Sequence, residues 1–292
     1  MYTENPNPAT ACIDTLNALE IVRLINAEDQ KVAGAVAAEL TNISRVIDHI
    51  TSRMKAGGRL IYIGAGSSGR MGALDAAECP PTFNTSPDLV IALIAGGTSA
   101  LTQALEGVED DTQAGVEDIS AVRVSELDSV VGIAASGHTP YTLSGMREAQ
   151  RRGALVVSIT CNPTTPMGEI AEIAITLLVG EEVIAGSTRL KSGSAQKMVL
   201  NMISTGVMIR LGKTYGNLMV DVQATNTKLK ERARHIVAQA CGLSLAHATT
   251  RLEDCDGEVK TAIVATITEI TPAEARLRLA AAHGVVRQAI AG

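Results

Sequence analysis

The chain of 292 residues is long enough for one large core or for a core with an appended subdomain. Hydrophobic residues make up 46% and charged residues 19%, a composition that is typical of a globular protein and excludes a disordered one. The net charge is −6 and aromatic residues make up only 2%, so a nucleic-acid-binding protein is not expected.

The cysteines and the N-terminal residues indicate the cellular compartment in which we expect the protein. The chain has five cysteines, an odd number, scattered without C-x-x-C spacing. The first 17 residues lack the charged-then-apolar pattern of a signal peptide, and no apolar run approaches the roughly 20 residues that a membrane span needs. We therefore expect a reduced, cytoplasmic protein with no membrane segment.

Helical and strand-like segments follow one another in a regular order. Residues 15–58 have apolar residues at helical spacing, and Gly57-Gly58 is a natural helix stop. Five apolar runs, rich in Val and Ile and separated by helical stretches, come next: 59–66, 89–97, 129–137, 154–162 and 172–180. Such runs are typical of buried parallel strands.

This order predicts an α/β fold with a doubly wound, mainly parallel five-stranded sheet, N-terminal helices and a small C-terminal helical subdomain. From Lys191 onward the pattern is helical, and Pro272 after Thr271 predicts the start of a late helix. We divide the chain into 1–56, an N-terminal helical segment packing on the sheet domain; 57–225, the sheet domain; and 226–292, the helical subdomain.

The first strand leads into Gly64-x-Gly66-x-x-Gly69, the spacing of a dinucleotide-binding loop. Such a site also needs an acidic residue at the end of the second strand, to bind ribose hydroxyls. That strand ends in Ala95-Gly96-Gly97, and Asp88 precedes it. The dinucleotide interpretation therefore fails.

Hydroxyl residues follow two strands that we expect to be neighbours. Ser67 and Ser68 follow the first, and Ser136 and Thr139 follow the third, just before Pro140. N–H groups at helix N-termini together with hydroxyls suit one phosphomonoester. Either pair alone could equally cap its helix, but the presence of both favours phosphate binding. The stretch 186–191, with Ser187, is a third polar loop, whose Arg189 and Lys191 could equally be solvated.

These loops resemble the phosphosugar-binding SIS (sugar isomerase) domain. A closer resemblance, from about Leu19 to the C-terminus, is to the N-acetylmuramic acid 6-phosphate etherase family. It rests on "GAGSSGRMGALDAAECPPTF", "ALEGVEDD", "VVGIAASGHTPY" and "GSTRLKSGSAQKMVLNMISTG". "AECPPT" and "EGVED" are specific to this family and to the related glucokinase regulatory protein.

The resemblance implies a homodimeric enzyme, with sites near the subunit interface, that splits N-acetylmuramic acid 6-phosphate into N-acetylglucosamine 6-phosphate and D-lactate during peptidoglycan recycling. It implies elimination followed by hydration, with no metal or organic cofactor. On this basis residues 57–225 are the SIS domain. The residues expected to bind the substrate or its phosphate are Gly66, Ser67, Ser68, Ser136, Gly137, His138, Thr139 and Ser187.

The resemblance places the two catalytic glutamates at Glu78, in "AECPP", and Glu109, in "EGVED". Glu109 would remove the C2 proton, and Glu78 would protonate the departing lactate and later activate water. Glu109 also fits a solvated helix end, and Glu106 is a neighbour that could be mistaken for it. We expect the prolines after Cys79 to end a helix beside Glu78.

Departures from the family pattern concern the phosphate loops. Ser67 stands where Thr is common, which keeps the hydroxyl, and His138 replaces an expected Arg. If that position holds phosphate, affinity would depend on pH, because histidine titrates near neutrality. His283 resembles a family position near the active site.

Two other functions use the same loops. One is a phosphosugar sensor like the glucokinase regulatory protein, although that protein is much longer and has a second SIS domain. The other is an aldose–ketose isomerase, which also abstracts a C2 proton but does not need Glu78 as an acid.

Overall fold

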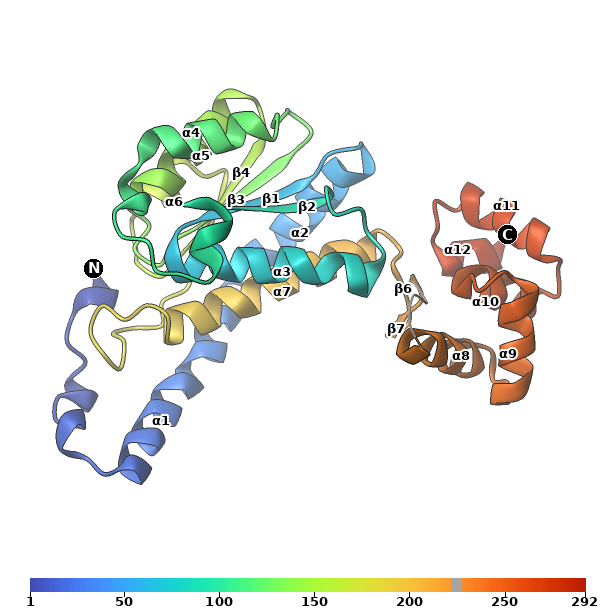
Figure 1. Ribbon diagram of the computed structural model, residues 1–292, viewed down its shortest axis with the longest axis horizontal. Coiled ribbons are helices and arrows are strands. Elements are labelled where there is room, and N and C mark those ends of the chain that lie inside the picture. The colour runs from blue at the N-terminus through green and yellow to red at the C-terminus, as the bar shows by residue number, and fades with distance from the viewer. Residues whose placement is uncertain (222–226) are drawn as a thin grey trace. The chain divides into compact units, whose positions relative to one another are not determined.

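The computed structural model describes residues 1–221 and 227–292. They form two compact units: unit 1 comprises Met1–Ala77 and Pro87–Ser204, and unit 2 comprises Glu78–Ser86 and Thr205–Gly292 (Figure 1). The domain boundaries predicted at residues 57 and 226 stay predictions. Among the described residues, no helix combines the length and apolar character needed to cross a lipid bilayer.

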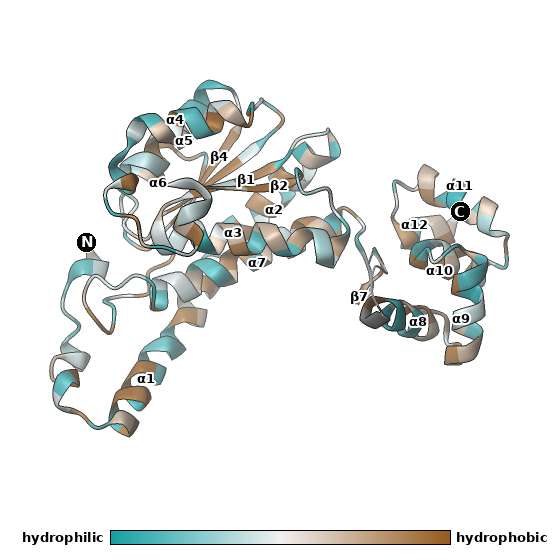
Figure 2. Cartoon of the chain, in the orientation of Figure 1, coloured by the Kyte–Doolittle hydropathy of each residue, from teal (hydrophilic) through white to brown (hydrophobic). Residues whose placement is uncertain are grey.

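Unit 1 is built on a parallel sheet whose three central strands are buried throughout and whose two edge strands are partly buried. Its strands are β1 (Leu60–Gly64), β2 (Val90–Ile94), β3 (Ser129–Ile133), β4 (Leu155–Thr160) and β5 (Ile173–Thr176). Their order is β2-β1-β3-β4-β5, and every neighbouring pair is parallel. The five apolar runs therefore form the predicted strands, and they are among the most apolar elements in Figure 2.

Helices cover both faces of this sheet, which confirms the doubly wound fold (Figure 1). On one face α3 (Gly66–Phe83) packs closely, since a Cβ at Gly72 would lie 3.0 Å from Tyr62 Cβ. On the other lie α4 (Thr112–Ala121), α5 (Pro140–Arg151) and α6 (Pro166–Ile170); a Cβ at Gly132 would clash with Met146 of α5.

The N-terminal region is helical, as predicted. Three short 3-10 turns, Tyr2–Glu4, Pro8–Thr10 and Ile13–Thr15, lead into α1 (Ala18–Ala37) and α2 (Leu40–Lys55). A capping box between Asn17 and Glu20 starts α1. After α2 the chain turns at Gly57, whose positive φ of 97° suits glycine.

Helix α7 (Lys191–Arg210) starts in a buried charged network. The carboxylate of Glu182 accepts hydrogen bonds from the backbone N–H groups of Lys191 and Ser192, at 3.0 and 2.9 Å, and from the Ser192 hydroxyl. The Lys191 ammonium pairs with Glu28 of α1 at 2.7 Å. Lys191 is thus buried in an ion pair, so the solvated alternative for this residue is wrong.

The prolines in α3 do not end the helix, contrary to the sequence-based expectation. Pro80 and Pro81 lie inside it, and the helix continues to Phe83. A proline lacks the N–H that would bond the carbonyl four residues earlier, which normally bends or breaks a helix. Here the buried side chains of Cys79 and Phe83 flank the prolines. Helical hydrogen bonding resumes after them, because the Asn84 N–H donates to the Pro80 carbonyl at 2.9 Å.

Unit 2 is mostly helical, with α8 (Thr227–Cys241), α9 (Leu245–Asp254), α10 (Val259–Thr268), α11 (Pro272–Ala281) and α12 (Val286–Ala291). Thr271 caps α11 and Pro272 begins it, as predicted. A hairpin of β6 (Thr214–Tyr215) and β7 (Leu218–Met219) precedes α8 and was not predicted. It turns at Gly216, whose φ is +58°.

Candidate functional site

The two hydroxyl-bearing loops follow adjacent strands. β1 pairs with β3, and Gly64 lies opposite Ile133 at their carboxyl ends. In the order β2-β1-β3-β4-β5, β2 is added on one side of β1 and the later strands are added on the other side. The gap between the loops that follow β1 and β3 is therefore the switch point, where ligands bind in open α/β sheets. We call residues 64–69 the first loop and residues 134–139 the second loop. Their adjacency confirms the sequence-based expectation.

In the first loop, glycines let the strand and helix approach closely. A Cβ at Gly69 would lie 2.7 Å from the Gly64 carbonyl oxygen, so no side chain fits there. Gly66 begins α3 with φ of +53° and is exposed. Ser67 is half-buried, and within the described chain neither its hydroxyl nor its N–H makes a hydrogen bond. This helix start therefore presents donors without partners.

The second loop turns sharply into α5. Gly137 has φ of +72° and packs against Thr165, the N-cap residue of α6. The Ser136 hydroxyl accepts from the His138 N–H at 3.2 Å, and the exposed His138 ring donates from Nδ1 to the Ser136 carbonyl at 2.8 Å. Thr139 occupies the N-cap position, but its side chain makes no capping hydrogen bond. This argues against the capping interpretation for Thr139.

Together the loops offer hydrogen-bond donors at two neighbouring helix N-termini. Along the described chain, no acceptor binds the N–H groups of Tyr141 and Thr142 in the first turn of α5. Unpaired N–H groups and the helix dipole attract anions, and hydroxyls can add further hydrogen bonds. The arrangement suits a ligand with a phosphate and nearby hydroxyls.

Ser187 lies in the turn before α7. Its N–H donates to the Ile184 carbonyl at 2.9 Å, and its carbonyl accepts from Leu190 N–H. The side chain is half-buried and has no hydrogen bond within the described part of the chain. Among the described residues, no backbone hydrogen bond links Ser187 to the two loops, and its role in ligand binding stays a prediction.

Glu109 lies in a short turn beside α5, the helix that follows the second loop. The 3-10 helix η5 (Val108–Asp110) carries it, and η5 lies against α5. Both Glu109 and Glu106 are exposed. Asp111 has a structural role, because its carboxylate accepts from Ala114 N–H at 2.9 Å and caps α4. Asp111 is therefore a helix cap, and the exposed Glu109 is compatible both with the solvated alternative and with the predicted catalytic role.

Arg70 ties the segment that leads to Glu109 to α3, and the sequence analysis missed this role. Its guanidinium donates to the carbonyls of Ala100, at 2.8 Å, and Gln103, at 2.7 Å. Ala100 belongs to the 3-10 helix η4 (Gly97–Leu101) after β2. The only sequence signal for Arg70 was its place in "SSGR", beside the two serines.

Glu78 is exposed on α3, and Asp75 lies one turn before it on the same helix. Asp75 is 5% exposed and accepts from Tyr62 Oη at 2.8 Å, Asn201 Nδ2 at 2.8 Å and Ser204 Oγ at 3.0 Å. Burial raises the pKa of Asp75 above its ordinary value, although each of these hydrogen bonds by itself lowers that pKa. Asp75 thus joins α3, β1 and α7.

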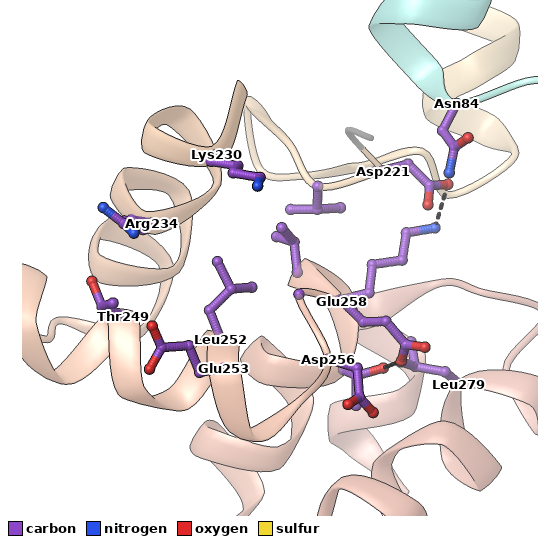
Figure 3. A pocket seen from close by; sticks show the side chains of 15 residues that line it. Asn84, Asp221, Lys230, Arg234, Thr249, Leu252, Glu253, Asp256, Glu258 and Leu279 are labelled. Atoms are coloured by element: carbon purple, nitrogen blue, oxygen red, sulfur yellow. Dashed lines mark hydrogen bonds and ion pairs between the residues drawn. The ribbon is translucent and has the colours of Figure 1, made fainter. Parts of the chain in front are cut away.

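Unit 2 contains a cavity of about 760 Å³ that none of the predicted site residues lines. Figure 3 shows Lys230 and Arg234 on one side of it and Asp221 and Asn84 on another. Lys260 pairs with Asp221 at 2.7 Å, and burial lowers its pKa. The cavity walls carry charges of both signs and no Gly/Ser loop, so we place the candidate site at the two loops instead.

The described residues contain no cluster of three or more His, Cys, Asp or Glu side chains that could hold a metal ion. His283 lies in unit 2 between α11 and α12, with φ of +50°. Its predicted contact with substrate stays a prediction.

Comparison with known proteins identifies the family. A family model described as the glucokinase regulatory protein N-terminal SIS domain matches residues 42–150. The chain is 51% identical over 290 residues to N-acetylmuramic acid 6-phosphate etherase 2 of Vibrio parahaemolyticus, covering 99% of this chain and 97% of that protein. The chain belongs to the N-acetylmuramic acid 6-phosphate etherase family. The resemblance seen in its motifs is thereby confirmed.

Further likenesses agree with this family. The etherase of Clostridium beijerinckii is also 51% identical, over 99% of this chain and 95% of its own length. A phosphoheptose isomerase from Francisella tularensis shares the fold with a TM-score of 0.52 and 15% identity, over 66% of this chain and 98% of that one. The second likeness shows the fold alone.

Proposed function

We propose that this etherase-family protein cleaves the D-lactyl ether of N-acetylmuramic acid 6-phosphate, giving N-acetylglucosamine 6-phosphate and D-lactate, in the cytoplasmic recycling of cell-wall amino sugars. Half of its residues are identical to those of proteins named for this activity, over nearly the whole chain. A cytoplasmic location fits the cysteines, since no disulfide joins any of the five, all of which lie in the described ranges.

The single observation that carries the proposal is the pair of adjacent helix N-termini with unpaired donors. The N–H groups of Tyr141 and Thr142 and the hydroxyls of Ser136, Ser67 and Thr139 can all donate to phosphate or sugar oxygens. Binding of the phosphate would fix one end of the substrate, and the reacting C2–C3 bond would then lie at a set distance from it.

The reaction needs a base and an acid. In the ring-opened sugar the C2 proton lies next to the C1 aldehyde, and Glu109 removes it, leaving an enolate. The electron pair then expels the C3 oxygen, and Glu78 protonates that oxygen as lactate leaves. The ionised Glu78 next takes a proton from water, whose oxygen adds to C3 of the unsaturated aldehyde. The protonated Glu109 then returns a proton to C2, which restores the sugar. The two carboxyl groups must start in opposite protonation states.

We further propose that the protein is a homodimer whose sites combine residues of both subunits. The two loops belong to unit 1, whereas Glu78 belongs to unit 2. In the dimer that we propose, a substrate held at the two loops of one copy meets Glu78 of the other copy.

Exposed apolar side chains in unit 1 support association. Leu19 and Val22 on α1 are 55% and 56% exposed, and Leu178 and Ile184 in the segment before α7 are both 52% exposed. Figure 2 shows apolar segments alternating with polar ones along α1. Exposed large apolar side chains are enriched at protein–protein interfaces, so these residues are candidates for the contact between subunits.

Incubation with N-acetylmuramic acid 6-phosphate in D2O tests the function. We expect release of D-lactate and incorporation of deuterium at C2. Glu109→Gln should abolish both. Glu78→Gln should lower lactate release by roughly 10²–10⁴-fold, because the leaving oxygen is no longer protonated, while C2 exchange continues.

Glu106→Gln is the matched control, because Glu106 is an exposed glutamate of the same segment. It should retain both activities. If the wild-type protein binds the phosphosugar tightly but neither releases lactate nor exchanges C2, the protein is a sensor and the enzyme proposal is wrong. Exchange with sugar isomerisation in place of lactate release would indicate an isomerase.

A further inference from the structure

The side chain of Gln196, on α7, contacts the first loop from inside the protein. Its Oε1 accepts a hydrogen bond from the Ser68 hydroxyl at 3.0 Å. Gln196 is only 1% exposed, and its Nε2 is buried with no hydrogen-bond partner among the described residues. An amide buried with a group unsatisfied costs free energy. A glutamine in this position therefore needs a reason beyond packing.

The bond to Gln196 sets what Ser68 can offer a ligand. A serine hydroxyl has one hydrogen to donate and two lone pairs to accept with. Since the hydrogen points to Gln196, Ser68 turns only lone pairs toward a ligand. The Ser136 hydroxyl is the opposite case, because it accepts from His138 N–H and keeps its hydrogen for a ligand.

A hydroxyl that accepts, like that of Ser68, and a hydroxyl that donates, like that of Ser136, suit different parts of a phosphosugar. Phosphate oxygens at neutral pH chiefly accept hydrogen bonds, so they need donors such as Ser136 and the free N–H groups of α5. A sugar hydroxyl can donate, so it can bind the lone pairs of Ser68. Ser68 of the first loop thus suits a sugar hydroxyl, and the second loop suits the phosphate.

We propose that Gln196 is a positioning residue that holds Ser68 as an acceptor for a sugar hydroxyl. This inference rests on the proposed function, since it takes the two loops as a phosphosugar site. Gln196 is itself held in place, because Asn201 and Ser204 of the same helix bond Asp75 of α3. Helices α3 and α7 are therefore also joined to each other further along both helices, C-terminal to the Ser68–Gln196 contact.

Binding measurements on wild type and Gln196→Leu, with N-acetylglucosamine 6-phosphate and with inorganic phosphate, test the proposal. Leucine removes the acceptor, so Ser68 is free to rotate. We expect affinity for the phosphosugar to fall about 10-fold, the value of one lost hydrogen bond, while affinity for inorganic phosphate changes less than about twofold. If both affinities fall equally, the inference is wrong.

Gln196→Glu separates the two ends of the amide. Glutamate offers Ser68 the same acceptor oxygen but no N–H, so we expect affinities close to those of the wild type. Were the amide turned the other way, Nε2 would donate to Ser68, and Gln196→Glu would weaken phosphosugar binding as much as Gln196→Leu does. That result would overturn the assignment of Ser68 as acceptor.

A double-mutant cycle shows whether Gln196 acts through Ser68. Gln196→Leu combined with Ser68→Ala should bind the phosphosugar no more weakly than Ser68→Ala alone, and additive losses would contradict the proposal. Ser158→Ala is the control, since it alters a buried hydroxyl that has no partner among the described residues and lies within β4. It should leave both affinities unchanged.

Thermal melting establishes that each variant is folded, and Gln196→Met replaces Gln196→Leu if the latter unfolds at the assay temperature. If wild type binds neither ligand, the proposed function fails and this inference with it. If wild type binds both and Gln196→Leu does not distinguish them, only the inference fails.

Discussion

At the scale of single residues, His138 is the clearest departure from the family pattern. Its Nδ1–H is bonded to the Ser136 carbonyl, which leaves Nε2 available at the exposed edge of the second loop. If Nε2 contacts the substrate phosphate, His138→Ala should raise KM about 10-fold, because a hydrogen bond to a charged group is lost.

The variant His138→Arg is the contrasting substitution, because its guanidinium can also donate hydrogen bonds to a phosphate. It should therefore keep KM close to that of the wild type. Steady-state kinetics of the three proteins on the same substrate measure the contribution of the contact. An unchanged KM in His138→Ala would show that His138 does not contact the phosphate.

Asp75 leads to a second residue-scale prediction, about stability. Its folded-state pKa is raised by burial. Its contribution to stability is therefore fully present below the unfolded pKa and is lost as pH rises through the folded pKa. Asp75→Asn cannot ionise but can still accept from Asn201 and Ser204. We expect it to gain stability relative to wild type as pH rises from about 4 to 8.

Asp75→Ala is the contrasting variant, because it leaves the Tyr62, Asn201 and Ser204 donors without their carboxylate. We expect it to lose about 3 kcal/mol of unfolding free energy. Urea denaturation across the pH range measures both variants. If Asp75→Asn is as unstable as Asp75→Ala at pH 8, the charged carboxylate stabilises the fold, and the predicted direction of the pH dependence is wrong.

At the scale of elements, the start of α7 holds α1 against the sheet domain through a buried ion pair. Burial alone would raise the pKa of Glu28, but hydrogen bonds from Lys191 and Lys31 hold it below its ordinary value. Lys191→Met leaves the buried Glu28 with only the partly exposed Lys31. We expect a loss of about 3 kcal/mol of unfolding free energy, measured by urea denaturation.

The double variant Glu28→Gln with Lys191→Met should recover much of this loss, because it removes the buried charge that was left unpaired. Arg234→Ala is the control: Arg234 forms an exposed ion pair with Glu231, and its loss should cost less than about 0.5 kcal/mol. Additive losses at Glu28 and Lys191 would mean that the pair is not coupled.

The elements also show where sequence patterns suffice and where they fail. Five strands were predicted because each is an unbroken apolar run that must be buried. The hairpin at Thr214–Met219 was missed because strands of two residues are too short to show a period. Helix α3 was expected to stop at its prolines, since a local rule cannot register the packing of Cys79 and Phe83 around them.

At the scale of the whole molecule, the proposed dimer predicts that two inactive variants can complement each other. If Glu78 acts on a substrate bound by the other subunit, a mixed dimer of Glu78→Gln and Glu109→Gln contains one site with both glutamates. Co-expression should restore up to about a quarter of wild-type activity. Light scattering gives the oligomeric state of each preparation.

The Glu78→Gln protein mixed with itself is the control and should remain inactive. A monomer in solution, or mixed dimers without lactate release, would mean that each chain supplies both of its own glutamates. Such a result would leave the family assignment intact, because that rests on sequence identity.

The sequence by itself determined the strands, the helical C-terminal region, the two hydroxyl loops and the family, because burial, turn chemistry and motifs are written in neighbouring residues. It did not show the partners of Ser68 or Asp75. Gln196 lies 128 positions from Ser68, and Asn201 lies 126 from Asp75. A glutamine in an apolar helix has no local signal of its target, so only the packing of α7 on α3 decided which hydroxyl it orients.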